Sequence, residues 1–585
     1  MGVPGFFLWL WKKYKKNNFV FNKNELQDQE LLDKVNSIDY LLIDANCLIH
    51  PTCFKVLAEN PDFKNQHSLE NKMIQATLDY IDKLINYVNP KKGVYLAIDG
   101  VAPVAKIKQQ RYRRFKSVHD KILWDNIKKK HNKQVPKFWN NSAITPGTVF
   151  MERLHYKILE WAKTKQIELI YSSCKTPSEG EHKLLQFIRN NIKLKKDYSY
   201  IMYGLDADLI FLCLSTNSPN MYLLREANQF DKKKASEELN YVSIDIMKEL
   251  IKDSIDEIAS CENNKDKDIQ LIEDKHTNNI INDFIFMCYL LGNDFLPHLP
   301  ALNIYTNGLD ILLEKYVELL AENNYKSFII DRKKSKITIN NKLFFQLISY
   351  LGSEESETLK NDFVTKRKYH KCDSTDPYDV EMHRIDNLYF KVDDPIQLGS
   401  DESKLWKTRY YKYHFHIDDD EEEEYVDRLV EEYLRGLRWI TEYYFDKCPS
   451  WIWYYPYDYP PFLEDINNFL EKNKKYDMNK FKFELGSPLK PFNQLLLVLP
   501  PQSSYLIPKE FKKIVKNSKS TLAFMYPTQI SQDFIGKHKY WMAQPLLPAL
   551  DIPLVRHIYH KYEKKISTNE LSRNKRLDIF SFNIK

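Results

Sequence analysis

The sequence predicts an α/β fold, with a mostly parallel central sheet flanked by helices and a second, largely helical and irregular region that braces it. Within residues 1–310, short apolar stretches rich in β-branched and aromatic residues alternate with stretches of helical periodicity. After about residue 310, long helical stretches and irregular polar ones replace this alternation. The chain of 585 residues is long enough for two or more cores, and we assign the two regions to residues 1–310 and 311–585.

The composition indicates a globular protein and leaves nucleic-acid binding open. Hydrophobic residues make up 43% of the chain and charged residues 28%, which is typical of folded rather than disordered proteins. The 86 lysines and arginines nearly balance 80 aspartates and glutamates, which leaves a net charge of +6. Any surface that binds an acidic polymer must therefore be local.

The cysteines and the N-terminal stretch bear on the cellular compartment. None of the eight cysteines forms a CxxC pair, so the sequence predicts neither a zinc site nor a disulfide framework. The aromatic stretch 5–16 is too short for a signal peptide or a membrane span. We therefore expect an intracellular, cytoplasmic protein that does not enter a membrane.

Three predicted strands in the first region end at aspartates. The first ends at Asp44 and the second at Asp99, with a helix over 69–88 between them, and the third ends just before Asp206. Aspartate is a poor strand residue and is unfavourable to bury alone, so packing does not explain the pattern. In a mostly parallel sheet, these side chains converge on one edge.

Two pairs of acids, each with one residue between its members, lie on either side of a predicted helix over 182–192. Glu179 and Glu181 precede this helix, whereas Asp206 and Asp208 follow the third strand. The strand before Asp206 ends where open α/β sheets place their sites. The sequence therefore predicts that both pairs face the same mouth.

Asp294 adds a further carboxylate to this set. An apolar helix stops at Gly292 and presents Asn293 and Asp294 on the turn that follows. Carboxylates gathered at one mouth repel each other strongly. Divalent cations relieve that repulsion, so we expect the acids to hold one or two Mg²⁺ or Mn²⁺ ions that act on a phosphate ester. The alternative is a pair of solvated acidic turns, which would be the better interpretation of a lone D-x-D.

A basic helical stretch follows Asp99 directly. Lys106, Gln110, Arg113 and Arg114 fall on one face of this helix. A cluster of positive charge and multiple donors beside an acidic metal site is what a terminal phosphate requires. An ordinary exposed basic helix is the alternative, and the position next to Asp99 favours the phosphate pocket.

Two side chains are candidates for stacking against a nucleobase. His50 lies six residues after Asp44, within reach of the same mouth. A flat ring near the scissile bond suits a base, although a lone histidine is more often a structural partner. Trp439 is the second candidate, and its spacing on a long helix also fits a core tryptophan.

The remaining segments are interpreted from their composition. Residues 253–280 are polar and charged, which predicts an insertion or a mobile loop. Seven consecutive acids at 418–424 begin a long amphipathic helix near 421–446, and acids at that end of a helix are favourable. The segments beyond this helix are rich in proline, tyrosine and tryptophan, and we expect them to wrap and brace a core.

Several motifs, in chain order, closely resemble those of the XRN-type 5′→3′ exoribonucleases. They are MGVPGFFLWL, DANCLIH, AIDGVAPVAKIKQQRYRRF, NSAITPGTVFM, PSEGEHKLLQFIR, YGLDADLIFL, LLRE and LLGNDFLPHLP. The resemblance continues through GLRWITEYYFDKCPSWIWYYPYDYPPF and SPLKPFNQLLLVLPP, so it covers nearly the whole chain. One such motif alone would be weak, but this ordered series is highly specific.

The resemblance implies a PIN/flap-nuclease-like core and a processive enzyme that degrades single-stranded RNA with a 5′-monophosphate to mononucleotides. The acids that bind metal in the family match Asp44, Asp99, Glu179, Glu181, Asp206, Asp208 and Asp294. The 5′-phosphate pocket of the family matches Lys106, Gln110, Arg113 and Arg114, its stacking histidine matches His50, and its aromatic partner matches Trp439. All seven acids are present, which argues against an inactive homologue.

The chain departs from the family pattern in three places. The N-terminus has Gly5, Phe6 and Phe7 where relatives usually have a basic residue followed by aromatic ones. Ser178 replaces a glycine that eases the turn before Glu179 in the family. The long C-terminal extensions of larger members are missing, so we expect a compact monomer whose protein partners, if any, the sequence does not identify.

Two other functions compete with this interpretation. A flap-type, structure-specific 5′ nuclease acting on DNA has a similar acidic site and would release oligonucleotides rather than mononucleotides. A non-catalytic RNA-binding scaffold is the other, and it would need broken metal ligands, whereas every acid of the set is in place.

Overall fold

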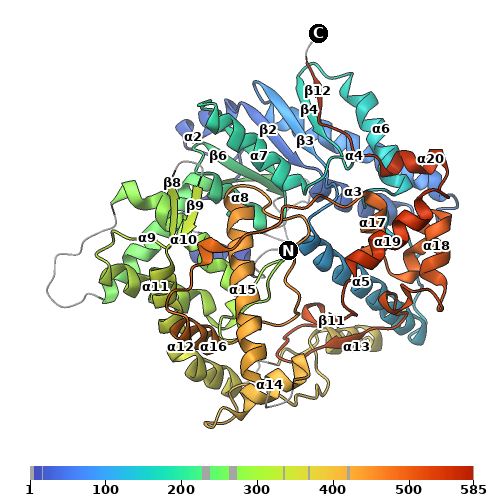
Figure 1. Ribbon diagram of the computed structural model, residues 1–585. Helices are drawn as coiled ribbons and strands as arrows, with labels where there is room; N and C mark the ends of the chain where they lie inside the picture. Colours follow the sequence, from blue (N-terminus) through green and yellow to red (C-terminus); the bar gives the residue numbers. More distant parts are fainter. Residues whose placement is uncertain are drawn as a thin grey trace.

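A computed structural model describes residues 5–583, except residue 16 and the segments 227–237, 263–272, 334–335, 366–368 and 418–421. Its centre is an eight-stranded sheet with the order β1-β7-β6-β5-β2-β3-β4-β12 (Figure 1). The strands β6, β5, β2, β3 and β4 run parallel, whereas β1, β7 and β12 pair antiparallel toward the two edges. The predicted mostly parallel sheet is confirmed.

The strands of this sheet are short and nearly all buried. Their bounds are β1 Val20–Phe21, β2 Tyr40–Asp44, β3 Gly93–Ala97, β4 Glu168–Ser172, β5 Tyr200–Tyr203, β6 Met221–Glu226, β7 Leu239–Ser243 and β12 Phe580–Phe582. All the parallel strands point their carboxyl ends to one edge, because each pair keeps a parallel register. The site begins at this edge.

Helices cover both faces of the sheet, as the alternation of side chains along its strands requires. Leu41 and Ile43 of β2 point into a cluster with α3, α4 and α6, whereas Leu42 points into a cluster with α7, α8 and α10. The helices of this part are α1 Phe6–Tyr14, α2 Gln29–Asn36, α3 Asn46–Glu59, α4 Gln66–Val88, α5 Val104–Lys130, α6 Val149–Ala162, α7 Gly180–Lys193, α8 Asp208–Thr216, α9 Ile244–Glu262 and α10 Thr277–Cys288.

The second region is mainly helical, as expected, with two small hairpins. Its elements are α11 Gly308–Glu322, β8 Ile330–Lys333, β9 Lys336–Ile339, α12 Asn341–Val364, α13 Pro377–Asp386, α14 Leu405–Phe415, α15 Glu422–Phe445, α16 Leu463–Lys472, α17 Pro491–Val498, α18 Lys509–Lys516, β10 Ser531–Asp533, β11 Gln544–Leu546, α19 Ile552–Glu563 and α20 Thr568–Leu571. The long helix expected near 421–446 is α15.

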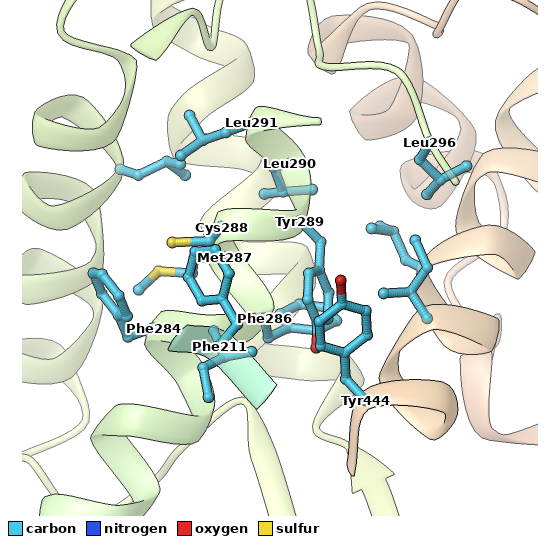
Figure 2. Packing of buried hydrophobic residues seen from close by; sticks show 14 of the residues in the cluster. Phe211, Phe284, Phe286, Met287, Cys288, Tyr289, Leu290, Leu291, Leu296 and Tyr444 are labelled. Carbon is cyan, nitrogen blue, oxygen red and sulfur yellow. The ribbon is translucent and has the colours of Figure 1, made fainter. Parts of the chain in front are cut away.

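The two regions share hydrophobic cores. Figure 2 shows Phe211 of α8 and Phe284 of α10 in the same cluster as Tyr444 of α15. On the other side of the molecule, α5 lies beside α17, α18 and α19 (Figure 1), and Ile107 of α5 shares a cluster with Leu495 of α17. The second region thus packs against the sheet region over two separate surfaces, and the division at residue 310 remains a prediction.

One expectation about a polar segment is partly wrong, and parts of two polar segments lie outside the described residues. The loop expected over 253–280 is wrong for 253–262, which belong to α9, and for 274–280, which form a short 3-10 helix and the start of α10. Residues 263–272 and the acids at 418–421 lie outside the described residues. No helix in the described part of the chain is both long and apolar enough to cross a lipid bilayer.

Candidate active site

Asp44 and Asp99 meet at the carboxyl edge of the sheet, as their positions in the sequence predict. Asp44 ends β2, and Asp99 follows the neighbouring β3 by two residues. The N–H of Gly180, the first residue of α7, donates to Asp99 Oδ1 at 2.7 Å. A Cβ on Gly180 would lie 2.8 Å from Asp44 Oδ1 and 3.4 Å from Asp99 Oδ1. Glycine is therefore required here for both carboxylates to approach the helix end.

Glu179 and Glu181 enter the same space from the first turn of α7. One ligand atom from each of Glu179, Glu181 and His182 lies within 4.8 Å of the others, and all three side chains are buried. The preceding residue, Ser178, has a φ of +104°, and its N–H donates to the carbonyl of Val101 at 3.0 Å. This turn joins the start of α7 to the loop that carries Asp99.

Asp206 and Asp208 follow β5, the other neighbour of β2. Asp208 is the first residue of α8 and is buried, whereas Asp206 is exposed. Arg225, at the end of β6, donates to the carbonyl of Leu205 and so holds the loop in place. The pair therefore reaches the site from the β5 side of β2, whereas Glu179, which follows β4, reaches it from the β3 side.

Asp294 is brought to the site by the turn after α10. A 3-10 helix at Tyr289–Leu291 ends at Gly292, whose φ is +85°. In Figure 2, Leu296, beyond this turn, lies beside α15. Lys106 Nζ then contacts both Asp294 Oδ2, at 2.8 Å, and Glu179 Oε1, at 2.5 Å. One ammonium group thus links acids that are far apart in the sequence.

The crowding of the acids shifts their pKa values. Burial and the neighbouring charge of Asp99 raise the pKa of Asp44 to about 8, and burial raises the pKa of Asp208 to about 7. Burial, followed by the charge of Glu179, also raises the pKa of Glu181 well above its ordinary value. At Asp294, burial acts in the same direction, but the ion pair with Lys106 outweighs it and the pKa lies below the ordinary value.

The donor set fits a hard divalent cation. Asp44 Oδ1 and Asp208 Oδ1 are buried without a hydrogen-bond partner among the residues that the structure describes. Buried carboxylate oxygens in this state need a proton, a water molecule or a cation as partner, and an all-oxygen ligand set is typical of Mg²⁺ and Mn²⁺. The acids at this edge of the sheet could therefore hold such an ion.

The other residues of the predicted phosphate pocket also lie on α5. Burial, followed by the charges of Arg113 and Arg114, lowers the pKa of His50 to about 4. Arg114 Nη2 donates to Thr145 Oγ1 at 2.8 Å, whereas its buried Nη1 has no partner among the described residues. Gln110 Oε1 accepts from Gln494 Nε2 at 2.9 Å. Arg113 is exposed.

One predicted role needs correction and one gains a second contact. Lys106, expected in a phosphate pocket, has its ammonium group between Glu179 and Asp294, and its role toward a phosphate stays a prediction. Trp439, expected to present a face to a base, is 0% exposed. Its ring stacks on Tyr443, and its Nε1 donates to the carbonyl of Ser450 at 3.2 Å. Core packing, the alternative interpretation, therefore describes Trp439.

Sequence reasoning missed several polar neighbours of the acids. Tyr443 of α15 donates its hydroxyl to Glu179 Oε2 at 2.6 Å. Asn46 Nδ2 donates to Asp99 Oδ2 at 2.7 Å. Lys183 Nζ donates to the carbonyls of Ile98 and Ser173, at the ends of β3 and β4, at 2.6 and 2.9 Å. The sequence could have indicated only Asn46 as a neighbour of the acids, because it lies two residues after Asp44. The position of a tyrosine on an amphipathic helix gives no such indication.

Known proteins resemble the chain over almost its whole length. The family model described as "XRN 5'-3' exonuclease N-terminus" matches residues 1–227, and the "Xrn1 helical domain" matches residues 274–376 and 332–582. The "5'-3' exoribonuclease 2" of Candida albicans is 29% identical over 98% of this chain and 74% of that protein. The "5'-3' exoribonuclease 1" of Homo sapiens is 30% identical over 98% of this chain and 35% of that protein.

A third relative shows a similar sequence identity, whereas the solved structure that resembles the chain is a distant match. The "5'-3' exoribonuclease 2" of Arabidopsis thaliana is 29% identical over 99% of this chain and 69% of that protein. A solved structure, "The catalytic core of Rad2 in complex with DNA substrate (complex III)", shares 12% identity with a TM-score of 0.31 over 82% of this chain and 97% of that chain, which is too distant to carry an argument. The two family models cover both regions of the molecule, and the chain belongs to the XRN 5′-3′ exonuclease family.

Proposed function

We propose that this protein is a metal-dependent 5′→3′ exoribonuclease that degrades single-stranded RNA bearing a 5′-monophosphate, processively and as a monomer. The observation that carries the proposal is the meeting of strand-end acids with the basic face of α5. Asp44 and Asp99 meet at Gly180, Lys106 of α5 contacts Glu179 and Asp294, and Arg113 and Arg114 follow Lys106 on the same helix. The name given to the relatives, 5'-3' exoribonuclease, agrees with this arrangement.

The acids and the basic residues have separate tasks in this reaction. We assign one or two Mg²⁺ or Mn²⁺ ions to Asp44, Asp99, Glu179, Glu181, Asp206, Asp208 and Asp294. A cation held by these acids would supply an activated water and would stabilise the oxyanion that leaves the first phosphodiester. The acids fix where positive charge can lie in the site, and that positive charge orients the scissile phosphate. Lys106, between Glu179 and Asp294, is in position to reach the same phosphate.

The pocket on α5 sets the position of the cut. Arg113 is exposed and Arg114 has a buried, unpartnered Nη1 among the described residues, so both can donate to a terminal phosphate. His50 stays neutral at neutral pH because its pKa is lowered to about 4, and its ring offers an uncharged face to the first base. Each cut exposes a new 5′-phosphate that can occupy the same pocket, which makes the enzyme processive.

The free thiols agree with an intracellular location. The seven cysteines whose side chains the structure describes, all but Cys261, are free thiols. Reduced cysteines are typical of the cytosol. We therefore propose that the enzyme acts in the cytoplasm.

The proposal is tested by a time course on one RNA that carries a 5′-monophosphate, a 5′-triphosphate or a 5′-hydroxyl group. We expect Mg²⁺-dependent release of mononucleotides from the first alone, and complete loss of cleavage in EDTA. Asp208→Ala should abolish cleavage and leave RNA binding largely intact, whereas Asp79→Ala, at an exposed position of α4, should change neither. Oligonucleotide products would instead support a flap-type nuclease, and binding without cleavage by the unmodified protein would support a scaffold.

A further inference from the structure

We propose that Tyr443, which lies in the second region, is a positioning residue for the metal ligand Glu179. The inference rests on the proposed function, because it assigns Glu179 to the metal. The Tyr443 hydroxyl donates to Glu179 Oε2 at 2.6 Å, and the exposed fractions of the two residues are 1% and 4%. The bond is therefore shielded from water, where a hydrogen bond to a charged acceptor is strong.

The phenol ring is fixed by other rings on several sides. His182 of α7 lies with its ring centroid 3.7 Å from that of Tyr443. Trp439, one turn earlier on α15, stacks on it at 4.7 Å with an interplanar angle of 22°, and Phe295 meets it edge-on at 5.3 Å. A tyrosine held in this way has few rotamers available, so its hydroxyl marks a fixed point in the site.

Glu179 needs such a fixed point because the backbone before it is unusual. Ser178 has a φ of +104°, and Glu179 itself has extended backbone angles before α7 begins. Its two carboxylate oxygens are divided between partners, with Oε1 toward Lys106 and Oε2 toward Tyr443. Tyr443 therefore holds the plane of the carboxylate and leaves Oε1, the oxygen that contacts the Lys106 ammonium, as the one that would face a cation. Because the phenol is neutral, it does so without adding a positive charge that would compete with that cation.

A second contact keeps α15 in register with α7. Arg189 of α7 is 5% exposed and donates to the carbonyls of Tyr444 and Asp446, the latter at 2.7 Å. These carbonyls lie at the C-terminal end of α15, immediately after Tyr443. Arg189 thus fixes the position of α15 along α7, the helix that follows Glu179. The second region therefore contributes to the metal centre the hydrogen bond from Tyr443 to Glu179, in addition to covering the site.

Tyr443→Phe tests the proposal because it removes the hydroxyl and keeps the ring. Groups that hydrogen-bond to metal ligands typically change metal affinity by about 10- to 100-fold when they are removed. We expect Mn²⁺ binding, measured by electron paramagnetic resonance without RNA, to weaken by roughly tenfold or more. The Mg²⁺ concentration for half-maximal RNA cleavage should rise by a similar factor, while RNA affinity in EDTA stays unchanged.

Tyr316→Phe is the matched control. Tyr316 is 0% exposed and donates its hydroxyl to another buried carboxylate, Asp283, at 2.8 Å. Its loss should lower the thermal stability of the protein without weakening Mn²⁺ binding. Tyr443→Leu, which also lacks the hydroxyl, repeats the measurement if the phenylalanine variant does not fold.

The possible outcomes separate this inference from the proposed function. Mn²⁺ affinity equal to that of the unmodified protein in either folded Tyr443 variant would overturn the positioning role alone. A matching loss in Tyr316→Phe would also overturn it, because the effect would then follow general stability. If the unmodified protein takes up no Mn²⁺, the proposed metal centre itself is wrong.

Discussion

Arg113 is the exposed member of the arginine pair on α5, so its loss should affect substrate choice more than folding. After burial, its charge is the next cause that lowers the pKa of His50, the predicted stacking residue. We predict that Arg113→Ala removes the preference for 5′-monophosphate over 5′-hydroxyl RNA. The ratio of the two cleavage rates measures this effect directly. Lys129→Ala, an exposed position on the same helix, should leave the ratio unchanged.

Ser178 has a backbone conformation that residues with a side chain rarely adopt. Its φ of +104° falls in a region that favours glycine, and strain of this kind typically amounts to about 1–3 kcal/mol. We predict that Ser178→Gly raises the free energy of unfolding by roughly 1 kcal/mol, measured by denaturant titration. Ser178→Ala retains the Cβ and should give no gain. An equal gain with alanine would attribute the effect to the hydroxyl group instead.

The acids could be predicted from the sequence, whereas their aromatic neighbours could not. Asp44 and Asp99 stand at strand ends, where burial of a charge has no explanation in packing. Trp439 and Tyr443 are four residues apart, so they lie on the same face of one helix. Both positions fit a residue of the core. Only the turn of α15 relative to α7 brings the hydroxyl of Tyr443 to Glu179, and this depends on contacts between segments far apart in the chain.

At the scale of elements, a buried carboxylate joins two helices of the second region. Glu355 of α12 accepts hydrogen bonds from the N–H groups of Leu463 and Glu464, at 3.0 and 2.8 Å, and so satisfies the start of α16. Burial raises the pKa of Glu355 from 4.5 to about 8, although these two bonds lower it. The folded state therefore holds a proton on this group over a pH range in which the unfolded chain has already lost it.

This difference predicts a pH-dependent loss of stability. Below the unfolded pKa, the carboxyl is protonated in both states and its contribution is fully present; as the pH rises through the folded pKa, that contribution is lost. The melting temperature of the unmodified protein relative to Glu355→Gln should therefore fall between about pH 5 and about pH 8, because glutamine does not ionise. A difference that is constant with pH would contradict the protonated state of Glu355.

The strands and helices of the sheet region followed their sequence pattern better than the polar segments did. The predicted helix over 69–88 is α4, which begins three residues earlier, because apolar residues recur along one face. The charged stretch 253–262 was expected to be a loop, yet it continues α9, whose Ile255 is fully buried. Polar composition alone does not exclude a helix that packs a few apolar side chains.

On the scale of the whole molecule, the shared cores make the two regions dependent on each other. Arg111 of α5 is 0% exposed and donates to the carbonyls of Leu497, at 2.9 Å, and of Met525. A fragment of residues 1–310 would leave this guanidinium without these partners and would expose the apolar residues that face α15 and α17. Loss of partners for a buried charge is among the most destabilising changes known.

We therefore predict that residues 1–310, produced alone, do not show a cooperative thermal transition and bind a hydrophobic dye such as ANS. The full chain should unfold cooperatively and bind little dye under the same conditions. A fragment that melts cooperatively and retains Mn²⁺ binding would show instead that the sheet region is an independent domain.

The pairing of β12 with β4 has a consequence for biosynthesis. Phe580 of β12 lies opposite Tyr171 of β4, so β4 receives its outer neighbour from a segment that is synthesised long after it. Until then, a growing chain carries β4 as an open strand edge, which is a site for pairing with other chains. The outer side of β4 is thus covered only after the helices between β4 and β12 have been made, and chaperones that shield strand edges have that interval in which to act.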